Sequence, residues 1–160
     1  MKGINQNFTN VIRFTDDLVF LRQRFIDSDD FFHTVNEKLL AANLVTIDFL
    51  QNIRLREREY STGLALESFS IAIPHTDIKF IKEPFVAFYQ LAEEMPWNEM
   101  GADENKLKIK FIILLGLVDT SSHIDFLQNL ITLFSTENHA DWLSKTQSSH
   151  DATNYLNKYI

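Results

Sequence analysis

Residues 70–77 read Ser-Ile-Ala-Ile-Pro-His-Thr-Asp, and this stretch indicates how the chain folds. The first four residues favour a strand, which ends at Pro74 because proline cannot donate a ladder hydrogen bond. His75 then stands just past the strand. Open α/β sheets bind their ligands at strand ends of this kind. The stretch therefore predicts a strand over residues 70–73 that presents an imidazole at the edge of a sheet.

The residues before this strand predict the end of a helix. Residues 54–60 read Arg-Leu-Arg-Glu-Arg-Glu-Tyr, and residues 61–63 follow as Ser-Thr-Gly. A dense run of charges is typical of an exposed helix end, and Gly63 breaks the helical pattern. We expect a small polar turn here that leads from the helix to the strand before His75.

Apolar residues at helical spacing predict three longer helices that begin near Ser28, Thr46 and His123, and two short ones near residues 140–145 and 151–160. Two aspartates follow Ser28, where the positive end of a helix dipole favours them. In the helix that Thr46 would cap, the side chains expected to face inward are Ile47, Leu50 and either Ile53 or Leu55.

Apolar runs predict strands over residues 17–21, 70–73, 85–89 and 107–118. Residues 92–106 are acidic, contain a proline and a glycine, and are expected to form a long loop. Helices interleaved with three or four strands indicate an α/β fold with a small mixed sheet sandwiched between helices. At 160 residues the chain is expected to be a single domain over residues 1–160, with residues 1–12 loose.

The composition of the chain argues against several classes of protein. The formal net charge of −7 argues against nucleic-acid binding, which normally shows a basic face. The chain has no cysteine, so neither a disulfide framework nor a thiolate metal site is expected. The longest apolar run, residues 111–118, is too short to span a bilayer, and no secretory signal is visible. These features predict a cytoplasmic protein that is not inserted in a membrane.

Two of the five histidines are candidates for chemistry. His75 is either a positioned functional group or a loop histidine without a role. His123 opens a helix directly after a buried strand, where unpaired N–H groups favour an anion, although a capping or solvated imidazole is the other interpretation. His33, His139 and His150 carry no pattern around them, and we interpret them as surface residues.

The arginines of the predicted helix end also allow two interpretations. Arg54, Arg56 and Arg58 form either a solvated helix terminus or a group in which one guanidinium grips a phosphoryl oxygen. His75 and His123 together would be half of a zinc site, but HExxH and HxH spacings are absent. GxxxxGK[ST], GxGxxG and GxSxG motifs are absent too, so we predict neither a metal nor a nucleotide cofactor.

On these motifs the chain resembles the enzyme IIA components of the sugar phosphotransferase system (PTS), in the fructose/mannitol superfamily. The resemblance rests on Arg-Glu…Ser-Thr-Gly at residues 56–63, Ala-Ile-Pro-His at residues 72–75, and His123 with the helix after it. It covers residues 14–160. The form of residues 56–64 and the Pro-His-Thr-Asp ending resemble the galactitol-type branch.

The resemblance implies a phosphotransferase whose His75 is phosphorylated by the phosphocarrier protein HPr and passes the group to a IIB component, which works with a IIC membrane permease. His123 and Arg56 would stabilise the phosphoryl group, and Thr62 would sit beside the site. No cofactor is implied. One departure is that Phe69 stands where the mannitol branch has a glutamate; Glu67 lies farther back and receives no role.

Two other functions stay open at this point. The first is a regulatory domain of the same shape, whose phosphorylation state is read by a transcriptional or metabolic partner. The second is a module that binds a metal or small ligand through His75 and His123. The sequence names neither the sugar nor the oligomeric state, and a homodimer is one option.

Overall fold

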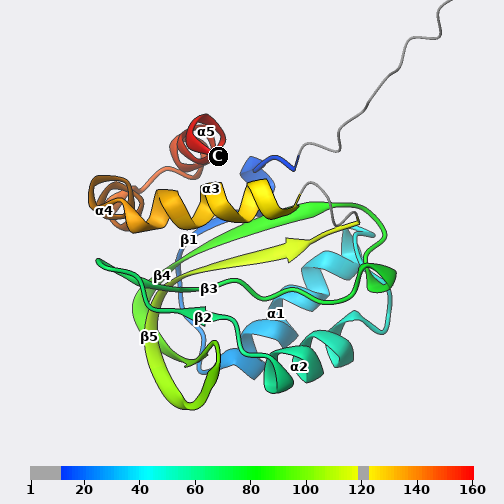
Figure 1. The fold of residues 1–160 in the computed structure, drawn as a ribbon. Coiled ribbons are helices and arrows are strands. Elements are labelled where there is room, and N and C mark those ends of the chain that lie inside the picture. Colours follow the sequence, from blue (N-terminus) through cyan, green and yellow to red (C-terminus); the bar gives the residue numbers. More distant parts are fainter. Residues whose placement is uncertain (1–11, 119–122) are drawn as a thin grey trace, which may run out of the picture.

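The computed structural model describes residues 12–118 and 123–160, without the side chains of Asp103 and His123. A mixed sheet with the strand order β1-β4-β2-β3-β5 lies between two layers of helices (Figure 1), which confirms the expected α/β architecture. The strands are β1 (Val19–Gln23), β2 (Gly63–Leu64), β3 (Ser70–Ala72), β4 (Phe85–Glu99) and β5 (Ala102–Gly116). The helices are α1 (Ser28–Ala41), α2 (Phe49–Glu59), α3 (His123–Ser135), α4 (Glu137–Lys145) and α5 (Ser149–Tyr159), with short 3₁₀ turns η1 (Asp16–Leu18) and η2 (Ile78–Phe80).

The long antiparallel hairpin of β4 and β5 is the centre of the sheet (Figure 1). β1 pairs with β4 in parallel, and β3 pairs with β5 in parallel through Ile71↔Phe111 and Ala72↔Ile112. Because β3 and β5 run the same way, their carboxyl ends lie at the same edge of the sheet. The residues that follow β3 therefore lie beside the end of β5.

The predicted loop over residues 92–106 is wrong, because these residues extend the β4–β5 hairpin to a tight turn at Met100 and Gly101. Gly101 has a φ of 75°, which a glycine adopts without strain. Met95 and Trp97 point into the core, while Glu93 and Glu94 before them and Pro96 between them are exposed. Pro96 lies beyond the part of β4 that pairs with β1, where a missing N–H is tolerated.

Two hydrophobic cores fill the spaces on either side of the sheet. α1 and α2 cover one face, and α3, α4 and α5 cover the other (Figure 1). Along β5, Ile112 and Leu114 enter the first core, while Ile113 and Leu115 enter the second. A strand that is buried on both faces reads as a continuous apolar run, as residues 111–115 do.

The second predicted helix begins later than expected. α2 starts at Phe49, and its buried positions are Phe49, Ile53 and Glu57. Ile47, predicted to face inward, precedes the helix and is 79% exposed, and Leu55 is also exposed. Apolar residues fall on two faces of this helix, so the helical spacing alone did not identify the buried one. Thr46 makes no side-chain cap; its carbonyl accepts from the Phe49 N–H at 3.1 Å.

The other expected elements agree with the structure within a few residues. α1 starts at Ser28, but its N-cap is Asp27, whose side chain accepts from the Asp30 N–H. The strand predicted over residues 17–21 is η1 followed by β1, and the two-residue β2 is an additional strand. No helix in the described ranges is long and apolar enough to cross a membrane. The prediction for residues 1–12 falls almost entirely outside the described residues.

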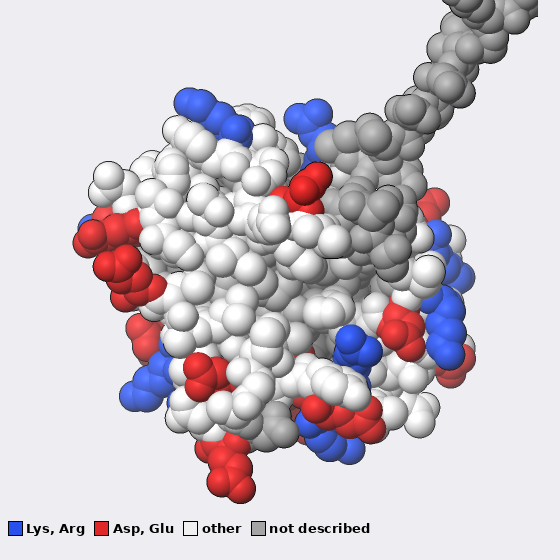
Figure 2. All heavy atoms as spheres, viewed as in Figure 1, with Lys and Arg blue, Asp and Glu red and all other residues white. Residues whose placement is uncertain are grey.

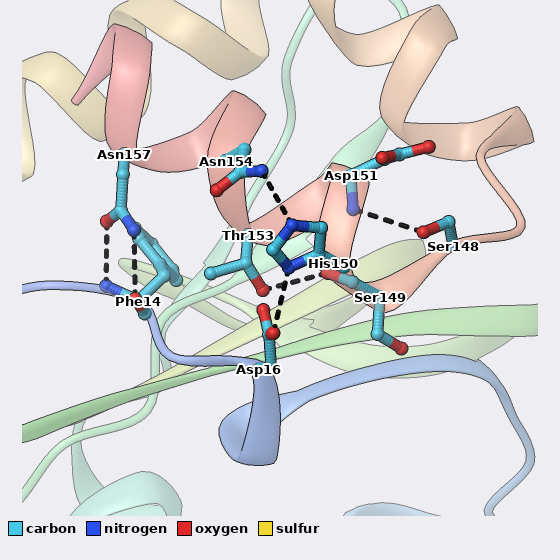
Figure 3. Close-up of polar contacts among 9 residues, drawn as sticks. All are labelled: Phe14, Asp16, Ser148, Ser149, His150, Asp151, Thr153, Asn154 and Asn157. Carbon is cyan, nitrogen blue, oxygen red and sulfur yellow. Dashed lines mark hydrogen bonds and ion pairs between the residues drawn. The ribbon is translucent and has the colours of Figure 1, made fainter.

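The segment before β1 is attached to the last helix by side-chain hydrogen bonds (Figure 3). Asn157 of α5 exchanges two hydrogen bonds of 2.9 Å with the backbone of Phe14. His150 lies with its Nδ1 2.9 Å from Oδ2 of Asp16. This contact raises the pKa of His150 and lowers the pKa of Asp16. It joins the two ends of the described chain.

The Asp16–His150 pair makes stability depend on pH in a defined window. The lowered pKa of Asp16 stabilises the fold at pH values above 3.8, the ordinary pKa of this group. This stabilisation is lost as the pH falls through the lowered pKa. Raising the pKa of His150 stabilises the fold below 6.5, and this is lost as the pH rises through the raised value. We therefore expect the pair to contribute most near pH 5.

A double-mutant cycle with Asp16→Asn and His150→Gln measures this contribution as a coupling in the free energy of unfolding. We expect the coupling to be favourable at about pH 5 and to shrink both at about pH 9 and in high salt, since both groups are exposed. A coupling of equal size at pH 5 and pH 9 would contradict the ion-pair interpretation.

Candidate active site

The backbone at His75 is fixed by the strand it follows. The Leu115 N–H donates to the Pro74 carbonyl at 3.1 Å, and His75 forms a parallel bridge with Leu115 at the end of β5. On the other side the Ile73 N–H donates to the Thr62 carbonyl at 3.3 Å. Pro74 therefore serves as an acceptor, and its missing N–H is not needed. As predicted, the strand ends with its histidine at the edge of the sheet.

The half-buried imidazole of His75 is held in one orientation. Its Nδ1 lies 2.9 Å from the backbone oxygen of Ile73. A carbonyl oxygen can only accept, so the proton of the neutral ring is on Nδ1. Nε2 then keeps its lone pair and is the atom available as a nucleophile.

His75 and Arg56 meet in one surface hollow of about 380 Å³, which we call the His75 hollow; it is lined by Arg56, His75, Thr76, Asp77, Ile78, Lys79 and Leu117. Nη1 of Arg56 is 4.0 Å from Oδ1 of Asp77, and the guanidinium lies over the Tyr60 ring. The Arg56 and Asp77 side chains are 41% and 63% exposed, so this ion pair is weak. The guanidinium is therefore free to turn toward an anion bound near His75.

Two charged lining residues were not predicted as site residues. Lys79 adds a second cation to the His75 hollow, and Asp77 adds a carboxylate. Both follow His75 closely in the chain, and η2 keeps them on the same side of the sheet edge. Their closeness to His75 in the sequence was the signal that could have identified them. A nucleophilic nitrogen beside two cations is suited to accepting a group that carries negative charge.

The other two predicted site residues are placed differently. His123 is the first residue of α3, the helix that follows β5, but its side chain and residues 119–122 lie outside the described residues. Thr62 is buried, does not line the His75 hollow, and places its hydroxyl 2.9 Å and 3.1 Å from the two oxygens of Glu57. Its carbonyl supports the strand before His75. The roles assigned to both residues stay predictions.

Glu57 is a buried carboxyl that the sequence did not single out. It accepts from the Thr62 N–H at 2.8 Å and from Nε1 of Trp97 at 2.7 Å. Burial raises the pKa of Glu57, although the hydrogen bonds from Thr62 and Trp97 oppose this shift. It ties the end of α2 to the turn at residues 61–63 and to β4. The signal that could have found it is its helical spacing from Phe49 and Ile53.

Gly63 completes this junction. A Cβ on Gly63 would lie 2.4 Å from the backbone oxygen of Asn98, so the short strand β2 approaches β4 too closely for any side chain. The glycine of the Ser-Thr-Gly turn is needed for this close approach. Glu57 and Gly63 together fix the helix that carries Arg56 against the strands that carry His75.

The remaining histidines have other partners. His33 is exposed and lies 3.7 Å from Glu37, and His150 pairs with Asp16. His139 is half-buried and contacts the Tyr155 hydroxyl, so it is less solvated than predicted. Within residues 12–118 and 123–160, apart from side chains not described, no group of three His, Cys, Asp or Glu side chains converges as a metal site would require.

Comparison with known proteins identifies a family for nearly the whole chain. Residues 13–159 match the sequence model of the family described as "Phosphoenolpyruvate-dependent sugar phosphotransferase system, EIIA 2". The galactitol-specific EIIA component of Escherichia coli K12 is 24% identical over 106 residues, which are 66% of this chain and 70% of that protein. The fructose-like EIIA component of the same organism is 34% identical over 56 residues, 35% of this chain and 36% of that protein.

Solved structures share the fold. The crystal structure of IIA mannitol from Escherichia coli has a TM-score of 0.72 at 21% identity, covering 91% of this chain and 99% of that one. IIA mannitol in its complex with phosphorylated IIB mannitol, from the same organism, has a TM-score of 0.73 at 20% identity, covering 91% and 98%. The nitrogen regulatory protein IIA-Ntr from Neisseria meningitidis has a TM-score of 0.70 at 21% identity, covering 89% and 94%.

The hydrogen bonds of Glu57 predict that its substitution lowers the free energy of unfolding more than substitution of the nearby Glu59. Glu57→Ala leaves the buried N–H groups of Thr62 and Trp97 without acceptors, and we expect it to lower the free energy of unfolding by about 2–4 kcal/mol. Glu57→Gln keeps one acceptor oxygen and should lose less. Glu59→Ala, at an exposed position of the same helix, is the matched control and should change stability by less than about 0.5 kcal/mol.

Urea denaturation followed by fluorescence measures all three variants. Equal shifts of the urea denaturation midpoint in Glu57→Ala and Glu59→Ala would contradict the stabilising role that we assign to Glu57.

Proposed function

Because this chain belongs to the EIIA 2 family of the phosphoenolpyruvate-dependent sugar phosphotransferase system, we propose that it carries a phosphoryl group on Nε2 of His75. The observation that carries this proposal is the hydrogen bond between Nδ1 of His75 and the Ile73 carbonyl. It leaves Nε2 unprotonated and available, next to Arg56 in the same hollow. A neutral imidazole is a competent nucleophile near pH 7.

In the accepting step, the Nε2 lone pair attacks the phosphorus of the phosphohistidine on HPr. An N–P bond forms to His75 while the N–P bond of the donor breaks, and the donor nitrogen keeps the electron pair. The ring of His75 retains its Nδ1 proton, so the phosphorylated ring gains positive charge. The Ile73 carbonyl, which accepts from that proton, stabilises this charge.

In the donating step, the thiolate of a cysteine on a IIB component attacks the same phosphorus. The N–P bond of His75 breaks, and Nε2 recovers its lone pair. The mannitol IIA structure solved in complex with phosphorylated IIB mannitol supports a IIB partner for this chain. No metal or nucleotide takes part in either step as we propose it.

Phosphoryl transfer requires the protein mainly to position the group and to stabilise its charge. Arg56 is suited to bind two phosphoryl oxygens at once, and Lys79 adds a cation in the same hollow. We propose His123, at the start of α3, as a third contact, since backbone N–H groups at a helix start favour an anion. Thr62 acts only through the backbone in this mechanism.

Carrier partners need access to His75, which is half-buried and lines a surface hollow. Figure 2 shows a face on which most Lys, Arg, Asp and Glu side chains lie toward the rim. α3 contributes one acidic residue and no lysine or arginine, and its Ile124 is exposed. Ile78, in the His75 hollow, is exposed as well, whereas Phe69 packs on Phe111. We propose that HPr and IIB dock around the His75 hollow and the start of α3, in the cytoplasm, with a separate IIC permease in the membrane.

The galactitol-type relative supports a sugar alcohol as the transported substrate, which this chain need not contact itself. The regulatory alternative shares the phosphorylation of His75 and differs only in the fate of the phosphoryl group. In that case a partner would read the phosphorylated state, and no IIB cysteine would receive the group.

Incubation with phosphoenolpyruvate, enzyme I and HPr tests the accepting step. We expect acid-labile phosphate on the wild type and none on His75→Ala, while His33→Ala, at an exposed histidine, labels like the wild type. Arg56→Ala should slow labelling by about 100-fold, since it removes a donor to the developing charge. Arg24→Ala is the matched control for lost charge, because Arg24 pairs with Glu93 on the surface.

Addition of a IIB component then separates a carrier from a regulator. We expect the phosphate to move to a IIB cysteine, and His123→Ala to accept phosphate but hand it on poorly. Labelling of His75→Ala at the wild-type rate would show that another residue is the acceptor. Phosphate that stays on His75 in the presence of each candidate IIB would favour the regulatory alternative.

A further inference from the structure

α2 presents arginines on two sides. Arg56 lines the His75 hollow, whereas Arg54 and Arg58 line a second one of about 250 Å³ between α2, the start of α1 and the β4–β5 hairpin. Residues two positions apart project to opposite sides of a helix, which explains the separation. We call this second space the α1–α2 hollow. Pockets for drug-sized ligands measure about 300–1,000 Å³, so it suits a smaller molecule.

Three cations line the α1–α2 hollow. Arg54 reaches Asp29, with its Nε 3.4 Å from a carboxylate oxygen and its Nη2 3.2 Å from the backbone oxygen. Its buried Nε nevertheless has no hydrogen-bond acceptor. Arg58 and Lys106 have no carboxylate within 4.0 Å among the described side chains. These groups can bind the oxygens of a phosphate.

The same space is lined by groups that would repel a bare anion and bind hydroxyl groups. Asp27 and Asp29 bring carboxylates, and Asn98 brings an amide. Asp27 uses Oδ1 to cap α1 through the Asp30 N–H at 2.8 Å. Its other carboxylate oxygen can accept from a hydroxyl. The hollow thus has cations that can bind a phosphate and, beside them, acceptors that can bind hydroxyl groups. This combination fits a phosphorylated polyol better than inorganic phosphate.

We propose that the α1–α2 hollow binds a small phosphorylated sugar or sugar alcohol, with its phosphate on Arg58 and Lys106 and its hydroxyls on Asp27 and Asn98. Compounds of this class are what a sugar phosphotransferase system produces, so the ligand's identity rests on the proposed function. The site itself rests on the lining residues. It is separate from the His75 hollow and takes no part in the transfer.

A chain of hydrogen bonds joins this site to the nucleophile. Trp97 lines the α1–α2 hollow and donates to Glu57, which also accepts from Thr62. The Thr62 carbonyl accepts from Ile73, whose own carbonyl fixes the ring of His75. A ligand that moves Trp97 would therefore shift the backbone that orients the His75 ring. The site is placed to report the product of transport to the carrier.

Calorimetric titration of the unphosphorylated chain tests binding without any phosphoryl transfer. The probes are galactitol 1-phosphate, neutral galactitol and inorganic phosphate. We expect galactitol 1-phosphate to bind at least tenfold more tightly than either of the others. Arg58→Gln combined with Lys106→Gln should weaken its binding at least tenfold. Arg24→Gln combined with Lys108→Gln removes the same charge outside the hollow and should leave binding unchanged.

Absence of binding by galactitol 1-phosphate would overturn the proposal, and so would equal binding of inorganic phosphate. Loss of binding in Arg56→Gln but not in the Arg58 and Lys106 double variant would place the ligand at the His75 hollow and would also overturn it. Failure of the proposed function would show instead as unlabelled His75 in the transfer assay, whatever the titration gives.

Discussion

The hydrogen bond from Nδ1 of His75 to the Ile73 carbonyl is the contact on which the site depends. It forms because packing and hydrogen bonds position the backbone two residues before His75. Ile71 and Ile73 are buried in the core, β3 is paired with β5, and the Ile73 N–H is held by Thr62. Packing in the core therefore fixes the orientation of one half-buried ring, and in the neutral ring this leaves Nε2 unprotonated.

The parts of the fold that local chemistry determines could be predicted from the sequence. A proline after three apolar or small residues marked the end of β3, and it placed His75 at the sheet edge. The unbroken apolar run of β5 indicated burial on both faces. Arg56 and His75 are 19 positions apart, and their meeting in one hollow follows from the parallel β3–β5 pair and the packing of α2.

The features that could not be predicted from the sequence depend on tertiary contacts. Glu57 stands in a run of charges that suggests solvent, yet Trp97 and Thr62 supply donors that let it be buried. The outer half of the β4–β5 hairpin looked like an acidic loop, because its two buried residues, Met95 and Trp97, are separated by a proline and flanked by charges. β2 is only two residues long, too short for any periodicity. Each of these features is stabilised by a partner distant in the sequence.

The most direct test of the proposed site is the protonation of the His75 ring. Long-range ¹H–¹⁵N correlation spectra of histidine-labelled protein, with His75 assigned by the missing signals of His75→Gln, report which nitrogen carries the proton. We expect the neutral ring with its proton on Nδ1, and Nε2 as the nitrogen that becomes bonded to phosphorus after phosphorylation. A neutral ring protonated on Nε2, or phosphate on Nδ1, would contradict the proposed geometry.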